Sequence, residues 1–200
     1  VGAASYPTEK IAQNSHDFRP LGLGYCDLGA LLMQQGVAYD SDMGRDVCAA
    51  VTALLGGVAY ATSAELSRQC GGPFQGYALN AEPMLNVISM HLDAATKGVM
   101  QSLVPPAFEG IHDTVGAEWC TALTEGTAWG FRNSQATVLA PTGSIGLAMD
   151  CDTTGIEPDT ALVKYKRLAG GGTVEIVNGS VEKALQSLGY DEATVQSVVA

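Results

Sequence analysis

Basic side chains are scarce in this sequence of 200 residues, which carries ten Lys and Arg against 21 Asp and Glu and has a formal net charge of −11. Affinity for nucleic acid comes largely from Lys and Arg that neutralise phosphate charges. The charge balance therefore argues against a nucleic-acid-binding protein. A local exception is a group of four basic residues in or near the segment 132–159, which contains the turn discussed below. They are Arg132, Lys164, Lys166 and Arg167.

A continuous apolar run of about 18 residues is also missing, so we expect no membrane span. The chain begins with Val-Gly-Ala-Ala and has neither a Met nor the basic and apolar blocks of a signal peptide there, which suggests a piece of a longer polypeptide. The five cysteines form no Cys-x-x-Cys pair, and their odd number suits a reducing compartment better than a disulfide framework. We therefore expect a cytoplasmic protein.

Motifs for metals and dinucleotides are incomplete. The three histidines share no ligand spacing with one another or with cysteine, so no zinc site is expected. Residues 150–155 resemble the start of a calcium loop, but Ala161 stands where the bidentate Glu is required. Gly22-x-Gly24 lacks the third glycine of a dinucleotide fingerprint, because Asp27 occupies that position. We expect no metal in this chain.

Helical periodicity dominates the chain. It predicts a short helix over residues 6–17 with Thr8 as cap, a long helix over 42–70, and a helix with Pro83 in its first turn. Further helices are predicted over 28–35, around 115–126, over 181–188 and after Asp191, and a hairpin over 164–168 and 173–177. Short apolar runs at 21–26 and 137–139 predict buried strands. Together these elements favour an α/β architecture with parallel strands and no internal domain boundary over residues 1–200.

The strand before residue 140 leads into a Thr-Gly-Ser turn and the start of a helix, where free backbone N–H groups can bind an anion. Thr142 and Ser144 supply hydroxyl groups, Gly143 allows a ligand to approach the backbone, and Pro141 fixes the backbone at the start of the turn. The residues alone leave two interpretations open. The turn is either a phosphate-binding site or an ordinary helix cap after a buried strand.

Several long blocks of the sequence resemble the large chain of adenosylcobalamin-dependent (class II) ribonucleotide reductases. The resemblance runs across nearly all of the chain in the family's order. The likeness of residues 150–155 to the cobalamin enzymes favours class II over the metal-dependent class I. The blocks lie at residues 19–25, 28–33, 39–42, 59–65, 132–137, 140–146 and 151–158.

The resemblance implies part of a ten-stranded α/β barrel, namely the half that follows a central finger loop. It implies that the substrate diphosphate is held by backbone amides of the turn formed by Pro141, Thr142, Gly143, Ser144 and Ile145. The implied reaction reduces a ribonucleotide to its deoxy form, with adenosylcobalamin generating a cysteine thiyl radical and a second pair of cysteines supplying electrons. The implied partners are the ribonucleotide, a deoxynucleotide effector, a thioredoxin-type reductant and a second copy of the chain in a homodimer.

The sequence departs from the full pattern, above all because the Asn-x-Cys-x-Glu motif of the finger loop does not occur in it, and neither the effector-binding segment nor the C-terminal thiol tail is visible. We therefore assign no catalytic residue here and expect this chain to be inactive alone. Cys26 stands where family sequences resemble Tyr-Ala-Asn-Leu-Gly, so it is not assigned as the radical cysteine, and Cys151 receives no role. Residues 152–158 are expected to form a structural turn lining the cavity. A non-catalytic nucleotide- or phosphate-binding module, or a scaffold piece with exposed barrel edges, are the alternatives.

Overall fold

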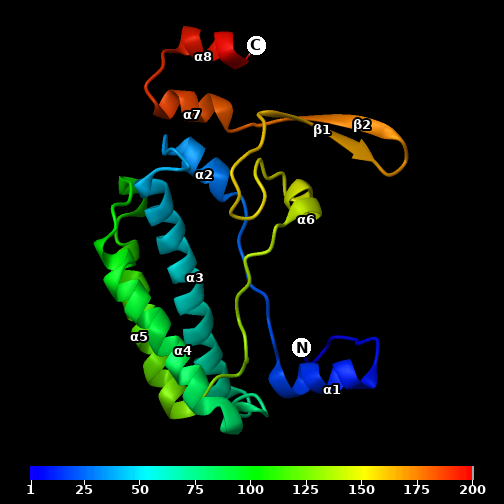
Figure 1. Cartoon of the computed structure of the whole chain (residues 1–200), viewed down its shortest axis with the longest axis vertical. Coiled ribbons are helices and arrows are strands. Elements are labelled where there is room, and N and C mark those ends of the chain that lie inside the picture. Colours follow the sequence, from blue (N-terminus) through cyan, green and yellow to red (C-terminus); the bar gives the residue numbers. More distant parts are fainter. Residues whose placement is uncertain (200) are drawn as a thin grey trace. The chain divides into compact units, whose positions relative to one another are not determined.

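A computed structural model describes residues 1–199, apart from the side chains of Met100 and Ile176, and shows a mostly helical chain (Figure 1). Its contacts divide it into two compact units. The first unit combines residues 1–24 with 49–138, and the second combines residues 25–48 with the chain from residue 139 onward. Each unit is therefore built from two stretches that are far apart in sequence.

The first unit is a helical assembly. Its elements are α1 (Glu9–Phe18), most of α3 (Asp42–Gln69), α4 (Tyr77–Lys97), two short 3-10 turns (Val99–Gln101 and Pro106–Phe108) and α5 (Ile111–Trp129), with α4 and α5 side by side (Figure 1). Their shared core centres on Ile88, Val115, Trp119 and Phe131. The predicted cap of α1 is confirmed, since the hydroxyl oxygen of Thr8 accepts from the amide of Ile11.

Two glycines in the middle of α3 allow α5 to approach closely. A Cβ atom at Gly56 would lie 2.7 Å from Cζ2 of Trp119, and one at Gly57 would lie 3.2 Å from Cδ1 of the same ring. The indole Nε1 of Trp119 donates to the carbonyl oxygen of Ala53 at 2.9 Å, which satisfies the polar end of the buried ring. The predicted long helix over 42–70 is thus confirmed, and its glycines serve close packing.

By length and composition alone, α3 could cross a membrane, with a mean hydropathy of 1.6 in its most apolar 18-residue window. Of that window, 44% is buried inside the protein. Ala50, Ala61 and Ala64 of α3 lie in the core of the first unit. The apolar character of α3 therefore serves this core.

The start of α4 differs from the sequence prediction. Pro83 lies inside the helix instead of in its first turn, because α4 begins at Tyr77. A proline there leaves the carbonyl of Leu79 without its helical donor. Leu79 is 90% exposed, so this part of α4 lies at the surface. The hydroxyl of Tyr77, which donates to the carbonyl of Gly126 at 3.2 Å, holds the added first turn against α5.

The second unit contains the only strands among residues 1–199. It comprises α2 (Leu28–Gln34), α6 (Gly143–Ala148), the antiparallel pair β1 (Val163–Leu168) and β2 (Gly172–Val177), α7 (Val181–Ser187) and α8 (Glu192–Val199). The register pairs Val163 with Val177, so the predicted hairpin is confirmed. The predicted cap at Asp191 is confirmed as well, because its carboxylate accepts from the amide of Thr194 at 2.8 Å.

The described residues form no closed barrel, and the two segments predicted as buried strands do not form regular strands of a sheet. They pair through one parallel bridge between Leu23 and Thr137. Three backbone hydrogen bonds join the two segments, from the amide of Leu21 to the carbonyl of Gln135, from that of Leu23 to Ala136, and from that of Val138 to Leu23. Leu23 is 48% exposed and Val138 is 43% exposed, so the expectation of burial was wrong for this chain. A barrel strand needs a paired neighbour on both sides, and here each segment has one.

Adding a methyl group at Gly126 should destabilise the first unit. A Cβ there would lie 2.1 Å from Cζ of Phe131, whose ring is fully buried and has nowhere to move. For Gly126→Ala we expect the free energy of unfolding to fall by about 1–3 kcal/mol, as for other overpacked cores, in chemical denaturation followed by circular dichroism. The neighbouring Thr127→Ala, on the exposed side of α5, should stay within about 0.5 kcal/mol of the parent. Equal stability of the two variants would contradict this packing.

Candidate functional site

The Thr-Gly-Ser turn leads directly into α6, as the sequence predicted. Thr142 is the N-cap residue and adopts a left-handed conformation with φ 50°, but its side chain makes no capping hydrogen bond to the helix. Its hydroxyl oxygen instead accepts from the amide of Gly155 at 2.6 Å. The turn is therefore tied to the loop that follows α6, and the ordinary side-chain cap is not formed.

The first amides of α6 have no acceptor among the residues that the structure describes, and their residues are exposed. The amide of Gly146 donates to the carbonyl of Thr142 at 2.7 Å, whereas the amides of Gly143, Ser144 and Ile145 have no acceptor within the described part of the chain. These three residues are exposed. A Cβ placed on Gly143 would meet no atom within 4 Å. Three N–H groups are thus accessible to a small anion.

The far end of α6 is fixed by a Schellman motif. Asp150 adopts the left-handed conformation with φ 58° that this motif requires. The amide of Cys151 donates to the carbonyl of Gly146 at 2.9 Å, and the amide of Asp150 donates to that of Leu147 at 3.2 Å. The short helix is thereby closed at its end, and the loop from Cys151 onward leaves it in a defined direction.

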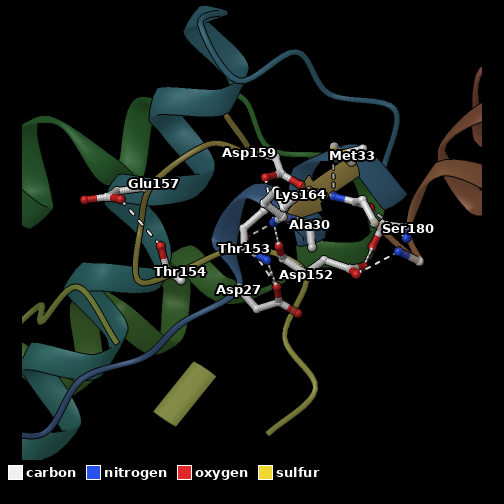
Figure 2. A network of polar contacts seen from close by, with 12 residues as sticks. Asp27, Ala30, Met33, Asp152, Thr153, Thr154, Glu157, Asp159, Lys164 and Ser180 are labelled. Atoms are coloured by element: carbon white, nitrogen blue, oxygen red, sulfur yellow. Dashed lines mark hydrogen bonds and ion pairs between the residues drawn. The ribbon is translucent and has the colours of Figure 1, made fainter. Parts of the chain in front are cut away.

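Asp27 holds this loop from the other stretch of the second unit. Its carboxylate oxygen accepts from the amide of Thr153 at 2.9 Å and from the hydroxyl of Thr153 at 3.2 Å (Figure 2). The same hydroxyl oxygen accepts from the amide of Ala30 at 3.2 Å. Gly29 lets the loop approach, because a Cβ there would lie 2.8 Å from the carbonyl oxygen of Glu157. The sequence showed Asp27 only as an obstacle to dinucleotide binding, and its structural role was missed.

Two further carboxylates of the loop, those of Asp152 and Asp159, each accept hydrogen bonds (Figure 2). Asp152 accepts from the amide of Gly179 at 2.7 Å and from the hydroxyl of Ser180 at 2.5 Å. Asp159, whose side chain is 7% exposed, accepts from Lys164 at 2.8 Å and from Asn178 at 2.6 Å. No group of three or more potential metal ligands is found among the described residues. These carboxylates therefore hold the loop and the hairpin together.

A cavity of about 270 Å³ lies beside the turn. Among its lining residues, Lys164 donates to the carbonyl of Asp152 and forms an ion pair with the carboxylate of Asp159. Lys166 is exposed and has no ion-pair partner among residues 1–199. Lys166 is thus the cation that can meet an anion entering the cavity. The lining residues are Gly143, Leu147, Cys151, Asp152, Thr154, Lys164, Tyr165 and Lys166.

The other two basic residues noted in the sequence differ in position. Arg167 follows on β1, next to Lys166. Arg132 belongs to the first unit, where its guanidinium donates to the carbonyl of Gly72 at 2.9 Å and its amide donates to the carbonyl of Ser63 at 3.0 Å. Arg132 therefore has a structural role within the first unit.

Cys26 and Cys151 meet in the second unit, with 3.5 Å between their sulfur atoms. Burial, the hydrogen bond with Cys26 and the nearby negative charge of Asp27 raise the pKa of the Cys151 thiol to about 11. The thiol is therefore mostly protonated at neutral pH, and its thiolate fraction rises with pH. Sequence spacing gave no sign of this pair, because the two cysteines are 125 positions apart.

Comparison with known proteins identifies the class of fold to which these elements belong. Residues 1–200 match the family described as "Ribonucleotide reductase, barrel domain" over their whole length. The chain therefore belongs to the barrel-domain family of ribonucleotide reductases. The described helices and the single hairpin are a part of such a domain, without a closed barrel.

The similar proteins identify the kind of reductase. The vitamin B12-dependent ribonucleotide reductase of Streptomyces coelicolor is 52% identical over 198 residues, which cover 98% of this chain and 20% of the relative. That of Rhodopirellula baltica is 52% identical over 207 residues, covering 100% and 19%, and that of Agrobacterium fabrum is 48% identical over 212 residues, covering 100% and 16%. The chain thus spans about a fifth of the length of these relatives, and the resemblance to cobalamin-dependent reductases is confirmed.

Removing the Thr142 hydroxyl should loosen the turn. In Thr142→Val the amide of Gly155 loses its acceptor, and we expect the free energy of unfolding to fall by about 1 kcal/mol. The amide of Gly155 should also exchange faster with solvent deuterium. Thr142→Ser keeps the hydroxyl and should preserve both quantities. If Thr142→Ser were as destabilised as Thr142→Val, the hydrogen bond would not be the stabilising contact.

Proposed function

We propose that this chain is a segment of the catalytic chain of a ribonucleotide reductase that converts ribonucleotides to deoxyribonucleotides with adenosylcobalamin. The family match over residues 1–200 and the names of the similar proteins support this proposal. Residues 1–200 would form one part of a single barrel domain. They would supply part of the barrel wall and the turn that binds the substrate. The radical cysteine and the acid/base carboxylate would lie outside the segment, since no Asn-x-Cys-x-Glu motif occurs in it.

The turn before α6 is proposed to bind the diphosphate of the substrate. The observation that carries this role is the set of three accessible amides at Gly143, Ser144 and Ile145, which can donate to phosphate oxygens. Pro141 and Thr142 hold the backbone in the required shape, the latter through its bond to Gly155. Lys166 adds a positive charge at the neighbouring cavity.

No residue of this chain is assigned to hold the cofactor. The cavity beside the turn measures about 270 Å³, which suits a phosphate-bearing group and not a corrin with its axial ligands. Adenosylcobalamin would supply the radical that starts the reaction. This chain's own contribution would be to hold the substrate's phosphate tail.

The remaining features of the whole enzyme are part of the same proposal. A ribonucleotide would be the substrate, with a deoxynucleotide effector, a thioredoxin-type reductant and a homodimeric, cytoplasmic assembly. The alternative is a module that binds nucleotide or phosphate without catalysis. The absence of a catalytic cysteine motif from the sequence is the observation that favours this alternative.

Binding of a ribonucleoside diphosphate tests the turn. In isothermal titration, Gly143→Pro should weaken binding about 10- to 100-fold, because it removes one N–H that donates to a charged oxygen. Gly143→Ala is the matched control: it keeps the N–H in a place with open space, and should bind more tightly than Gly143→Pro. Lys166→Glu should weaken binding in a salt-dependent way, whereas Lys10→Glu in α1 should not. Unchanged affinity in Gly143→Pro would remove the turn from the binding site.

Turnover by the complete polypeptide that carries residues 1–200 tests the reaction. We expect it to form deoxynucleotides when adenosylcobalamin and a dithiol are supplied, without a second protein subunit. Dependence on a separate metal-radical subunit would contradict the cobalamin assignment. Nucleotide binding with no turnover under either condition would support the non-catalytic module instead.

A further inference from the structure

Two of the five cysteines lie within reach of each other. Cys26 immediately precedes Asp27 and α2, Cys151 follows α6, and their sulfur atoms are 3.5 Å apart although 125 positions separate them in the chain. Both side chains are half-buried, and both residues belong to the second unit. By contrast, Cys70 and Cys120 are exposed and belong to the first unit. The pair is therefore a specific feature of the second unit.

Neighbouring contacts fix the backbone on both sides of the pair. Asp27, next to Cys26, accepts both the amide and the hydroxyl of Thr153, two residues after Cys151. The amide of Cys151 itself donates to Gly146 at 2.9 Å. A disulfide has a sulfur–sulfur bond of about 2.05 Å, so the two sulfurs must close by about 1.5 Å. Side-chain rotation can supply part of this movement.

We propose that Cys26 and Cys151 form a reversible disulfide, which makes the pair a redox modification site beside the candidate turn. This inference does not rest on the proposed function, because it follows from the geometry of the second unit alone. Its chemical partner is a small disulfide oxidant that can reach Cys151 from the cavity that this residue lines.

The exchange balances in two steps. One thiol of the pair loses its proton, and its thiolate attacks the oxidant disulfide, which forms a mixed disulfide and releases one thiolate of the oxidant. The second thiol then attacks the protein sulfur of the mixed disulfide and releases the other half of the oxidant. Two thiols and one disulfide become one protein disulfide and two small thiols, and the two protons pass to the released thiolates.

The negative charges around the pair favour a neutral oxidant over an anionic one. The carboxylates of Asp27 and Asp150 lie close enough to Cys151 to raise its pKa, and they repel an anionic reagent such as oxidised glutathione. Bis(2-hydroxyethyl) disulfide is neutral and small. It is therefore the oxidant used in the test.

The test treats the complete polypeptide that carries residues 1–200 with this oxidant, blocks the remaining thiols with N-ethylmaleimide and maps the peptides by mass spectrometry. We expect a cross-linked peptide that joins Cys26 to Cys151, with Cys70 and Cys120 alkylated. Dithiothreitol should convert the cross-linked peptide back to two alkylatable thiols. Oxidised protein in which these two residues remain free, or carry only the reagent, would overturn the proposal.

Two variants separate a specific pair from random oxidation. In Cys26→Ala the cross-link should disappear, and Cys151 should become fully alkylatable or carry the reagent as a mixed disulfide. Cys70→Ser removes an exposed cysteine of the first unit. In this variant the cross-link between Cys26 and Cys151 should still form, at no less than half the rate seen in the unmodified protein. Cross-linking of Cys151 to another cysteine with equal yield in Cys26→Ala would contradict the assignment. Circular dichroism of both variants checks that they fold.

Discussion

The hydrogen bonds between Asp27 and Thr153 are the constraint on which the second unit depends. They join residues 126 positions apart, and one carboxylate oxygen of Asp27 accepts from both the backbone amide and the hydroxyl of Thr153, a residue that is 2% exposed. A buried donor left without its acceptor costs about 1–3 kcal/mol, so this contact is costly to lose. The path of the loop, the approach of Gly29 to Glu157, and the meeting of Cys26 with Cys151 all require the two stretches to be held in this way.

The distribution of charge around the turn is compatible with the proposed anion site, although the chain as a whole is acidic. The formal net charge is −11, but Asp152 and Asp159 are directed at donors from Gly179, Ser180, Asn178 and Lys164. Their negative charge is thereby partly compensated locally. The accessible amides of α6 and the exposed Lys166 remain as the groups that can attract an anion.

Local patterns in the sequence predicted the helices and the hairpin, because amphipathic periodicity and caps such as Thr8 and Asp191 act over a few residues. The start of α4 was mispredicted, since proline favours a first turn, whereas long-range contacts such as that of Tyr77 with α5 hold an additional turn before Pro83. The barrel strands could not be confirmed because their hydrogen bonds depend on neighbouring strands. The position of the turn was predictable from Thr142 and the residues after it, but the bond to Gly155 was not, because it depends on the path of the following loop.

The second unit consists of residues 25–48 and the chain from residue 139 onward, and in the sequence these two stretches are separated by residues 49–138 of the first unit. During synthesis, α2 leaves the ribosome long before the residues that it contacts in the second unit. Leu28, Ala30 and Leu32, which are buried in the folded structure, stay unburied until those residues have been synthesised. Closing so long a loop carries an entropic penalty and slows folding. The turn and its loop can therefore form only after the first unit has been synthesised, so a ribosome-bound chain that contains only a folded first unit would still lack the turn proposed to bind an anion.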